Sequence, residues 1–322
     1  MINRARIRKT DFLLLATCVF MMISGLIGCA ANKSNLPPEE QYNVTLDSDA
    51  TQKALSDTTS AEYERLGDHF FGRDDLVKAF LNYEKALQLD PDNIGLHYKK
   101  GLSLLAGKIN EDAIKEFQAV IKRDSGYAPA YEGLALAYYQ MKEHKKSERN
   151  LKKAIELNPK LWKSHNYLGT IYDRQKKYEQ AIQHYYAAIV LRPDEKILYN
   201  NLGVSYYLAG EYSRAVVAFN NALENNYVEA RTYNNLGLAL ARLGRYREAL
   251  VAFRKGGNEA QAHNNLGCIY LEQGKFKEAI DSFTKAIEIN PLFYSKASDN
   301  LQKARRAYRE RIPSLKTNGI GD

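Results

Sequence analysis

The pentapeptide YNNLG occupies residues 199–203 and recurs at 233–237, and a variant, HNNLG, occupies 263–267. The first interval is 34 residues and the second is 30. Alignment of the chain on the Leu-Gly pair divides it into seven consecutive units, of which only the sixth is shorter than 34 residues. The units are 60–93, 94–127, 128–161, 162–195, 196–229, 230–259 and 260–293.

Four positions of the unit keep their residue type. Position eight is glycine except for Ala135, position twenty is alanine except for Ser147, and position twenty-four is aromatic except for Leu151. Position thirty-two is proline in four units: Pro91, Pro159, Pro193 and Pro291. A glycine inside a helix costs about 1 kcal/mol relative to alanine. It is therefore expected only where two helices touch, so positions eight and twenty predict the contact between a first and a second helix.

The pattern resembles the tetratricopeptide repeat (TPR) family. That resemblance implies an all-α fold: a right-handed superhelical solenoid of seven helix-turn-helix repeats over 60–293. Gly210, Gly244 and Gly274 stand between the helices, where a left-handed residue ends the first helix. Residues 294–312 are expected to form a C-terminal capping helix, with its arginines facing outward or forming a lipid- or acid-binding patch, and 313–322 a loose tail. Gly256-Gly257 should end the sixth second helix about one turn early, with a kink or an altered twist.

The N-terminus has the layout of a signal peptide, with a basic segment followed by the apolar run FLLLATCVFMMISGLI at 12–27. The run ends in LIGC at 26–29, which looks like a bacterial lipobox. The resemblance implies that residues 1–28 are removed and that Cys29 is lipidated, and Ala30 points to the outer membrane. The alternative is an uncleaved anchor with a chance cysteine. Residues 29–59 contain few large apolar side chains and are expected to form a flexible tether.

The repeated asparagines fall at positions five and six of the first helix. In the TPR family these positions point into a concave groove, so the resemblance implies an exposed asparagine ladder that bonds the backbone of an extended partner peptide. Tyr139, Val204, Tyr207 and Leu238 would form apolar pockets, and three arginines would favour acidic groups. The expected groove residues are Asn166, Asn200, Asn201, Asn234, Asn235, Asn264, Asn265, Tyr207, Arg174, Arg231 and Arg242. The alternative is that the asparagines lie in water or bond their neighbours.

Catalytic and metal-binding motifs are absent from the sequence, so neither an enzyme nor a cofactor is expected. His97, His165 and His263 share position four, where packing on the previous unit is expected, and Cys268 is expected to be a small apolar residue. Removal of residues 1–28 would lower the net charge from +8 to +5, which does not favour nucleic-acid binding.

We therefore expect an adaptor on the periplasmic face of the outer membrane that binds proteins or extended peptides, loosely similar to lipoproteins of Tad or type IV pilus assembly. Pilus or secretion-system assembly is favoured. The alternatives are an adaptor for peptidoglycan hydrolases or for outer-membrane protein assembly, and an accessory subunit of an enzyme complex.

Overall fold

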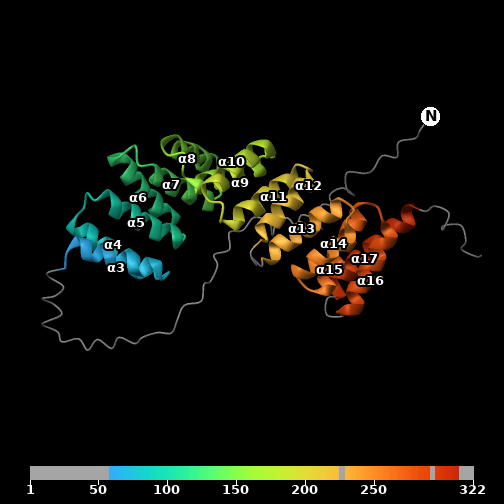
Figure 1. Ribbon diagram of the computed structural model, residues 1–322. Coiled ribbons are helices and arrows are strands. Elements are labelled where there is room, and N and C mark those ends of the chain that lie inside the picture. The colour runs from blue at the N-terminus through green and yellow to red at the C-terminus, as the bar shows by residue number, and fades with distance from the viewer. Residues whose placement is uncertain (1–57, 225–228, 291–293, 312–322) are drawn as a thin grey trace, which may run out of the picture. The chain divides into compact units, whose positions relative to one another are not determined.

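The computed structural model describes residues 58–224, 229–290 and 294–311. These residues form fifteen α-helices, arranged as seven helix pairs plus a C-terminal helix, and no strand (Figure 1). The expected all-α repeat array is confirmed. The chain divides into two compact units at Pro193, which we call the N-terminal unit (58–193) and the C-terminal unit (194–311).

The N-terminal unit contains four helix pairs, in which each helix packs against the next. Its helices are α3 (Ser60–Gly72), α4 (Leu76–Leu89), α5 (Ile94–Ala106), α6 (Asn110–Arg123), α7 (Ala128–Gln140), α8 (His144–Leu157), α9 (Trp162–Arg174) and α10 (Tyr178–Leu191). The first of them begins with a capping box, in which Thr59 and Glu62 each bond the other's backbone N–H.

The C-terminal unit contains three helix pairs and a final helix. Its helices are α11 (Lys196–Leu208), α12 (Tyr212–Ala222), α13 (Ala230–Arg242), α14 (Tyr246–Lys255), α15 (Glu259–Glu272), α16 (Phe276–Ile289) and α17 (Tyr294–Arg311). Six of the seven first helices begin at the first residue of a 34- or 30-residue sequence unit, and α15 begins one residue earlier.

The position-eight glycines lie where the two helices of a pair cross, as predicted. A Cβ atom on Gly203 would come within 2.6 Å of the Phe219 ring, and one on Gly101 within 2.7 Å of the Phe117 ring. The third repeat has different residues at both positions. Position eight is Ala135 and position twenty-four is Leu151, and both are fully buried. The glycine therefore makes room for an aromatic ring from the second helix.

The turn between the two helices of each pair contains one left-handed residue. Gly210, Gly244 and Gly274 have φ values of +83°, +76° and +71°, so the predicted role of these glycines is confirmed. In the N-terminal unit the same position is Asp74, Lys108, Lys142 and Lys176, with φ between +60° and +63°. A side chain in this conformation costs roughly 1–2 kcal/mol, so four turns of the N-terminal unit are strained.

The sixth second helix is short, as predicted. Helix α14 has 10 residues whereas α16 has 14, and it ends at Lys255, next to Gly256. A Cβ atom on Gly256 would lie 2.7 Å from the Ala230 carbonyl oxygen and 2.8 Å from the Asn234 side chain. Glycine thus lets the end of α14 lie directly against α13.

Helix α17 covers the last repeat. Ala297, Leu301 and Ala304 are buried, and Leu301 and Ala304 pack in one cluster with Phe283. Its four arginines at 305, 306, 309 and 311 are exposed, as expected for a cap with a solvated outer face. Arg311 also donates a hydrogen bond to the Gly274 carbonyl oxygen at 3.2 Å.

The predicted signal peptide, Cys29, nearly all of the predicted tether and the predicted tail lie outside the described residues. Within the described ranges, no helix combines the length and the apolar character needed to cross a membrane.

Candidate functional site

Asn200 and Asn235 do not form part of an exposed ladder. Their exposed fractions are 1% and 4%, and Asn235 Nδ2 donates to Asn200 Oδ1 at 3.1 Å. Thr232 Oγ1 donates to the same oxygen at 3.2 Å. The expectation of solvent-facing side chains is wrong here, because the amides join α11 to α13 inside the core.

Asn264 repeats this arrangement one step further along the chain. It is 3% exposed, and its Oδ1 accepts a hydrogen bond of 3.0 Å from Nδ2 of Asn300, which is 4% exposed. The same Asn300 nitrogen lies 3.6 Å from the Cys268 sulfur, which is buried as expected. An amide pair therefore joins α15 to α17, and Asn264 cannot bond a partner without breaking that pair.

Asn234 is half-buried and donates a hydrogen bond of 3.0 Å from Nδ2 to the Gly256 carbonyl oxygen. Gly256 follows the last residue of the short helix α14. Asn234 therefore caps the end of the helix that is shortened in the 30-residue repeat. Asn201 accepts a 3.4 Å hydrogen bond from Asn200 and is half-buried, as are Asn166 and Asn265. For these three, binding to a partner stays a prediction.

Arg242 is engaged within the fold. Its Nε donates to the Tyr207 hydroxyl at 3.2 Å and its Nη2 lies 2.7 Å from a Glu272 carboxylate oxygen. Burial raises the pKa of Tyr207, although Arg242 beside it favours the phenolate. The guanidinium thus ties α11, α13 and α15 together, which differs from the predicted role in binding a partner's acidic groups. Arg231 is half-buried and Arg174 is exposed, and their predicted roles remain predictions.

The predicted apolar pockets of the C-terminal unit are closed. Val204, Tyr207 and Leu238 line a cavity of only about 10 Å³, together with Phe219 and Asn235. A water molecule needs roughly this volume, so no partner side chain enters here without displacing the packing.

The first helices of the N-terminal unit present polar groups that are partly exposed. Lys99 Nζ lies 2.7 Å from a carboxylate oxygen of Glu64 and 2.7 Å from one of Asp68. These three side chains are between 32% and 47% exposed. Sequence reasoning missed them, although acidic residues at positions five and nine followed by lysine one repeat later indicate such an ion pair.

Two further contacts continue this face along α7 and α9. Glu132 accepts hydrogen bonds from the Ser164 backbone N–H at 3.0 Å and from its hydroxyl at 2.6 Å. The Tyr139 and Tyr167 rings meet edge to face with centroids 5.0 Å apart. We call the partly exposed side chains Glu64, Asp68, Lys99, Glu132, Tyr139 and Tyr167 the N-terminal face.

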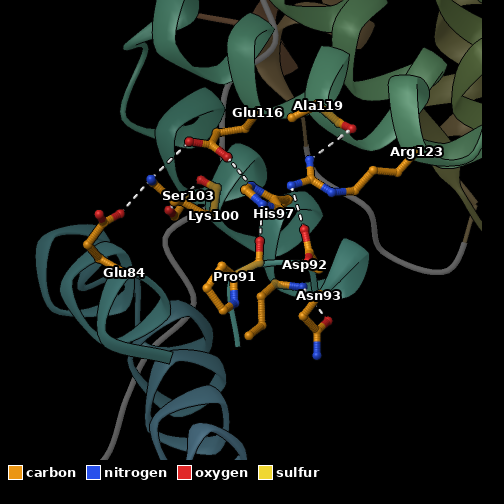
Figure 2. Close-up of polar contacts among 11 residues, drawn as sticks. Glu84, Pro91, Asp92, Asn93, His97, Lys100, Ser103, Glu116, Ala119 and Arg123 are labelled. Carbon is orange, nitrogen blue, oxygen red and sulfur yellow. Dashed lines mark hydrogen bonds and ion pairs between the residues drawn. The ribbon is translucent and has the colours of Figure 1, made fainter. Parts of the chain in front are cut away.

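Two of the three position-four histidines, His97 and His165, bond the preceding repeat, which agrees with their predicted packing role, and Figure 2 shows His97. His263 is buried, and its Nε2 lies 3.2 Å from a carboxylate oxygen of Glu259 on its own helix. The Nε2 atom of His97 lies 3.0 Å from the Pro91 carbonyl oxygen, and its Nδ1 atom lies 2.7 Å from a carboxylate oxygen of Glu116. His165 lies 3.3 Å from the Pro159 carbonyl oxygen and 3.0 Å from His184.

Lys100 joins His97 and Glu116 in one polar cluster (Figure 2). Its Nζ atom lies 2.5 Å from a carboxylate oxygen of Glu84 and 2.9 Å from one of Glu116. Burial disfavours the ammonium, but the hydrogen bonds with Glu84 and Glu116 outweigh burial and raise the pKa of Lys100. The cluster thereby connects α4, α5 and α6. Across the described residues, no three potential metal ligands lie close enough together to hold an ion.

Comparison with known families agrees with this architecture. Tetratricopeptide repeat models match residues 128–161, 162–195, 200–256 and 260–293. The chain is therefore a tetratricopeptide repeat protein, a class whose repeats bind proteins and peptides.

Individual proteins resemble this chain over different shares of their length, and the chain spans only a small part of the curated relatives it matches. The TPR repeat-containing thioredoxin TTL4 of Arabidopsis thaliana is 28% identical over 104 residues, which is 32% of this chain and 15% of that protein. A crystal structure of the APC/C hetero-tetramer Cut9-Hcn1 has a TM-score of 0.54 and 22% identity, covering 79% of this chain and 51% of that one. A tetratricopeptide repeat protein from Parabacteroides merdae has a TM-score of 0.53 and 18% identity, covering 76% and 98%. These likenesses concern the fold alone.

Proposed function

We propose that the protein is a membrane-anchored adaptor that holds protein partners on its repeats. The observation that carries this proposal is the N-terminal face, where first helices of successive repeats present partly exposed charged and aromatic side chains. Tyrosine side chains supply contact area in protein interfaces, and charged side chains steer association and fix the register of a partner. The buried asparagines of the C-terminal unit support stability instead.

The proposed anchor is a lipid on Cys29, supported by the LIGC motif at 26–29 and by the basic and apolar leader before it. Two or three acyl chains give stable anchoring because each buried CH₂ contributes about 0.8 kcal/mol. Ala30 favours the outer membrane as the destination. Within this proposal the partners belong to an envelope assembly, with a pilus or secretion system favoured. An adaptor for peptidoglycan hydrolases or for outer-membrane protein assembly is the alternative, and an accessory subunit of an enzyme complex is another.

Metabolic labelling with palmitate tests the anchor. The wild-type protein should be labelled and should fractionate with membranes, whereas Cys29→Ser should remain an unlabelled precursor. An unlabelled wild-type protein would show that the leader is not a lipoprotein signal.

Crosslinking in intact cells followed by affinity capture tests the adaptor role. We compare the wild type with Lys99→Glu, which reverses the positive charge of the N-terminal face, and with Arg149→Glu, which makes the same change at an exposed position of a second helix. Specific partners should be lost in the first variant and kept in the second. If the wild type crosslinks to no protein, the adaptor proposal fails.

A further inference from the structure

The two short second helices of the C-terminal unit border a cleft. Helix α12 has 11 residues and α14 has 10, whereas α4, α6, α8, α10 and α16 each have 14. Together with α13, they enclose a cavity of about 340 Å³. Ligand pockets typically range from about 300 to 1,000 Å³, so this cleft lies at the small end of that range and has room for one large side chain.

The cleft has an apolar floor. Val216, Leu236, Leu240 and Ala252 line it and are each no more than 8% exposed. Val251 stands at its edge and is 50% exposed. An apolar side chain that entered would leave water and contact these residues, which is the usual source of affinity for a buried anchor.

The rim of the cleft is mainly basic. Arg245, Arg247 and Lys255 line it together with one acidic residue, Glu248, so the rim has two positive charges in excess. Arg245 and Glu248 form an ion pair of 2.6 Å, and Lys255 lies 5.4 Å from the centroid of the Tyr233 ring. Because Arg245 and Glu248 neutralise each other, Arg247 and Lys255 are the two positive charges that attract an acidic partner.

We propose that this cleft binds an acidic peptide segment of a protein partner through one large apolar anchor side chain. The inference deepens the proposed function and rests on it, since it assigns the partner chemistry of one surface of the adaptor. The anchor fills the space over Val216, Leu236 and Ala252, and carboxylates on either side of it approach Arg247 and Lys255. Such a charge arrangement mainly accelerates association and selects the partner.

Fluorescence anisotropy with the full mature chain and three labelled peptides tests the chemistry. The first peptide has a Trp-Leu pair between glutamates, the second has Ser-Ser between glutamates, and the third has Trp-Leu between lysines. We expect the first to bind at least tenfold more tightly than either of the others. Equal affinity for the first two peptides, or no binding of the first, would overturn the proposal.

Matched charge reversals locate the site. Arg247→Glu combined with Lys255→Glu should weaken binding of the first peptide at least tenfold, whereas Arg305→Glu combined with Arg309→Glu on α17 should change it less than twofold. Val251→Ser, at an exposed edge position, should weaken it several-fold without altering the thermal unfolding midpoint. Equal losses from the two charge reversals would indicate unspecific attraction and contradict the assigned cleft.

Crosslinking in cells separates this inference from the adaptor proposal. If the wild type and the Arg247→Glu, Lys255→Glu variant crosslink to the same partners with equal yield, the cleft is not a docking site although the adaptor role stands. If the wild type captures no partner, the adaptor role itself fails.

Discussion

The N-terminal and C-terminal units are built from the same repeat but join successive first helices differently. In the N-terminal unit, Lys99 forms partly exposed ion pairs with Glu64 and Asp68. In the C-terminal unit, neutral amides meet in the core, as in the 3.1 Å hydrogen bond between Asn235 and Asn200. The same two positions, five of one repeat and six of the next, thus form an accessible polar contact in one unit and an internal connection in the other.

The ion pairs and the amide pairs differ in how much they contribute to the free energy of unfolding. Exposed ion pairs contribute about 0–1 kcal/mol and are screened by salt. A buried amide left without its partner costs about 1–3 kcal/mol. The N-terminal unit can therefore change its polar face at little cost to folding, and the C-terminal unit cannot. Surface that can vary freely is suited to partner recognition.

The largest expected difference between the units concerns acid. Burial, together with the neighbouring His165 and Lys152, lowers the pKa of His184 to about 4, against an ordinary value of 6.5. Below pH 6.5 the unfolded chain binds a proton that the folded chain does not, so stability falls as the pH decreases from 6.5 to 4. The loss amounts to roughly 3 kcal/mol at the lower end of that range.

Hydrogen exchange of α9 and α10 between pH 7 and pH 4 measures this effect. His184→Glu recreates at the fourth repeat the histidine–carboxylate pair that His97 and Glu116 form in the second. The variant should keep more of its protection at pH 4.5 than the wild type does. Equal loss in both proteins would show that another group governs acid unfolding.

Asn200→Ala should destabilise the C-terminal unit by about 2–3 kcal/mol, because Asn235 Nδ2 loses its acceptor inside the core and Thr232 loses one of two. Urea unfolding followed by circular dichroism measures the change. Asn201→Ala, at the half-buried neighbouring position, is the matched control and should cost less than about 1 kcal/mol. Two equally small losses would mean that the amide pair contributes nothing to stability.

Exchanging the turn residues tests the second contrast between the units. Gly244→Lys should lower stability by about 1–2 kcal/mol because its φ is +76°. Lys108→Gly should raise it by up to about 1 kcal/mol, since relief of its strained φ of +62° exceeds the entropy that glycine adds to the unfolded chain. Thermal unfolding midpoints in opposite directions are expected, and a lower midpoint for Lys108→Gly would contradict the strain argument.

The smallest effect concerns position twenty of the third repeat. Ser147 is fully buried, and its hydroxyl has no hydrogen-bond partner among the described residues. Ser147→Ala should raise stability by about 1 kcal/mol, because it removes a buried unsatisfied group. The reverse change at the equivalent buried position, Ala113→Ser, should lower stability by a similar amount. Chemical denaturation of both variants compares them directly.

The sequence predicted what depends on steric volume and backbone conformation. Gly203 indicated a helix crossing and Gly210 a left-handed turn, because glycine meets both demands without steric cost. The environment of Asn200 was not predictable from its own repeat, since an asparagine is compatible with water, a peptide or another amide. Its partners are Thr232 and Asn235, and a polar residue at these positions of the next repeat was the available signal.

The cleft beside α14 could not be predicted from the sequence either. Gly256 predicted an early end of that helix, but no glycine or proline marks the early end of α12 at Ala222. Lys142 illustrates the same limit in a turn, because a lysine gives no local sign of a positive φ.

The fit between position eight and position twenty-four has a consequence for how such an array grows. Gly203 and Phe219 lie in one repeat, so a duplicated repeat inherits both halves of its helix crossing and folds its own pair without adjustment. The amide pair of Asn200 and Asn235, by contrast, spans two repeats, so an inserted or deleted unit separates its members. The pairs that span two repeats in the N-terminal unit, such as Lys99 with Glu64, are partly exposed, so their separation costs less than that of the buried amides in the C-terminal unit.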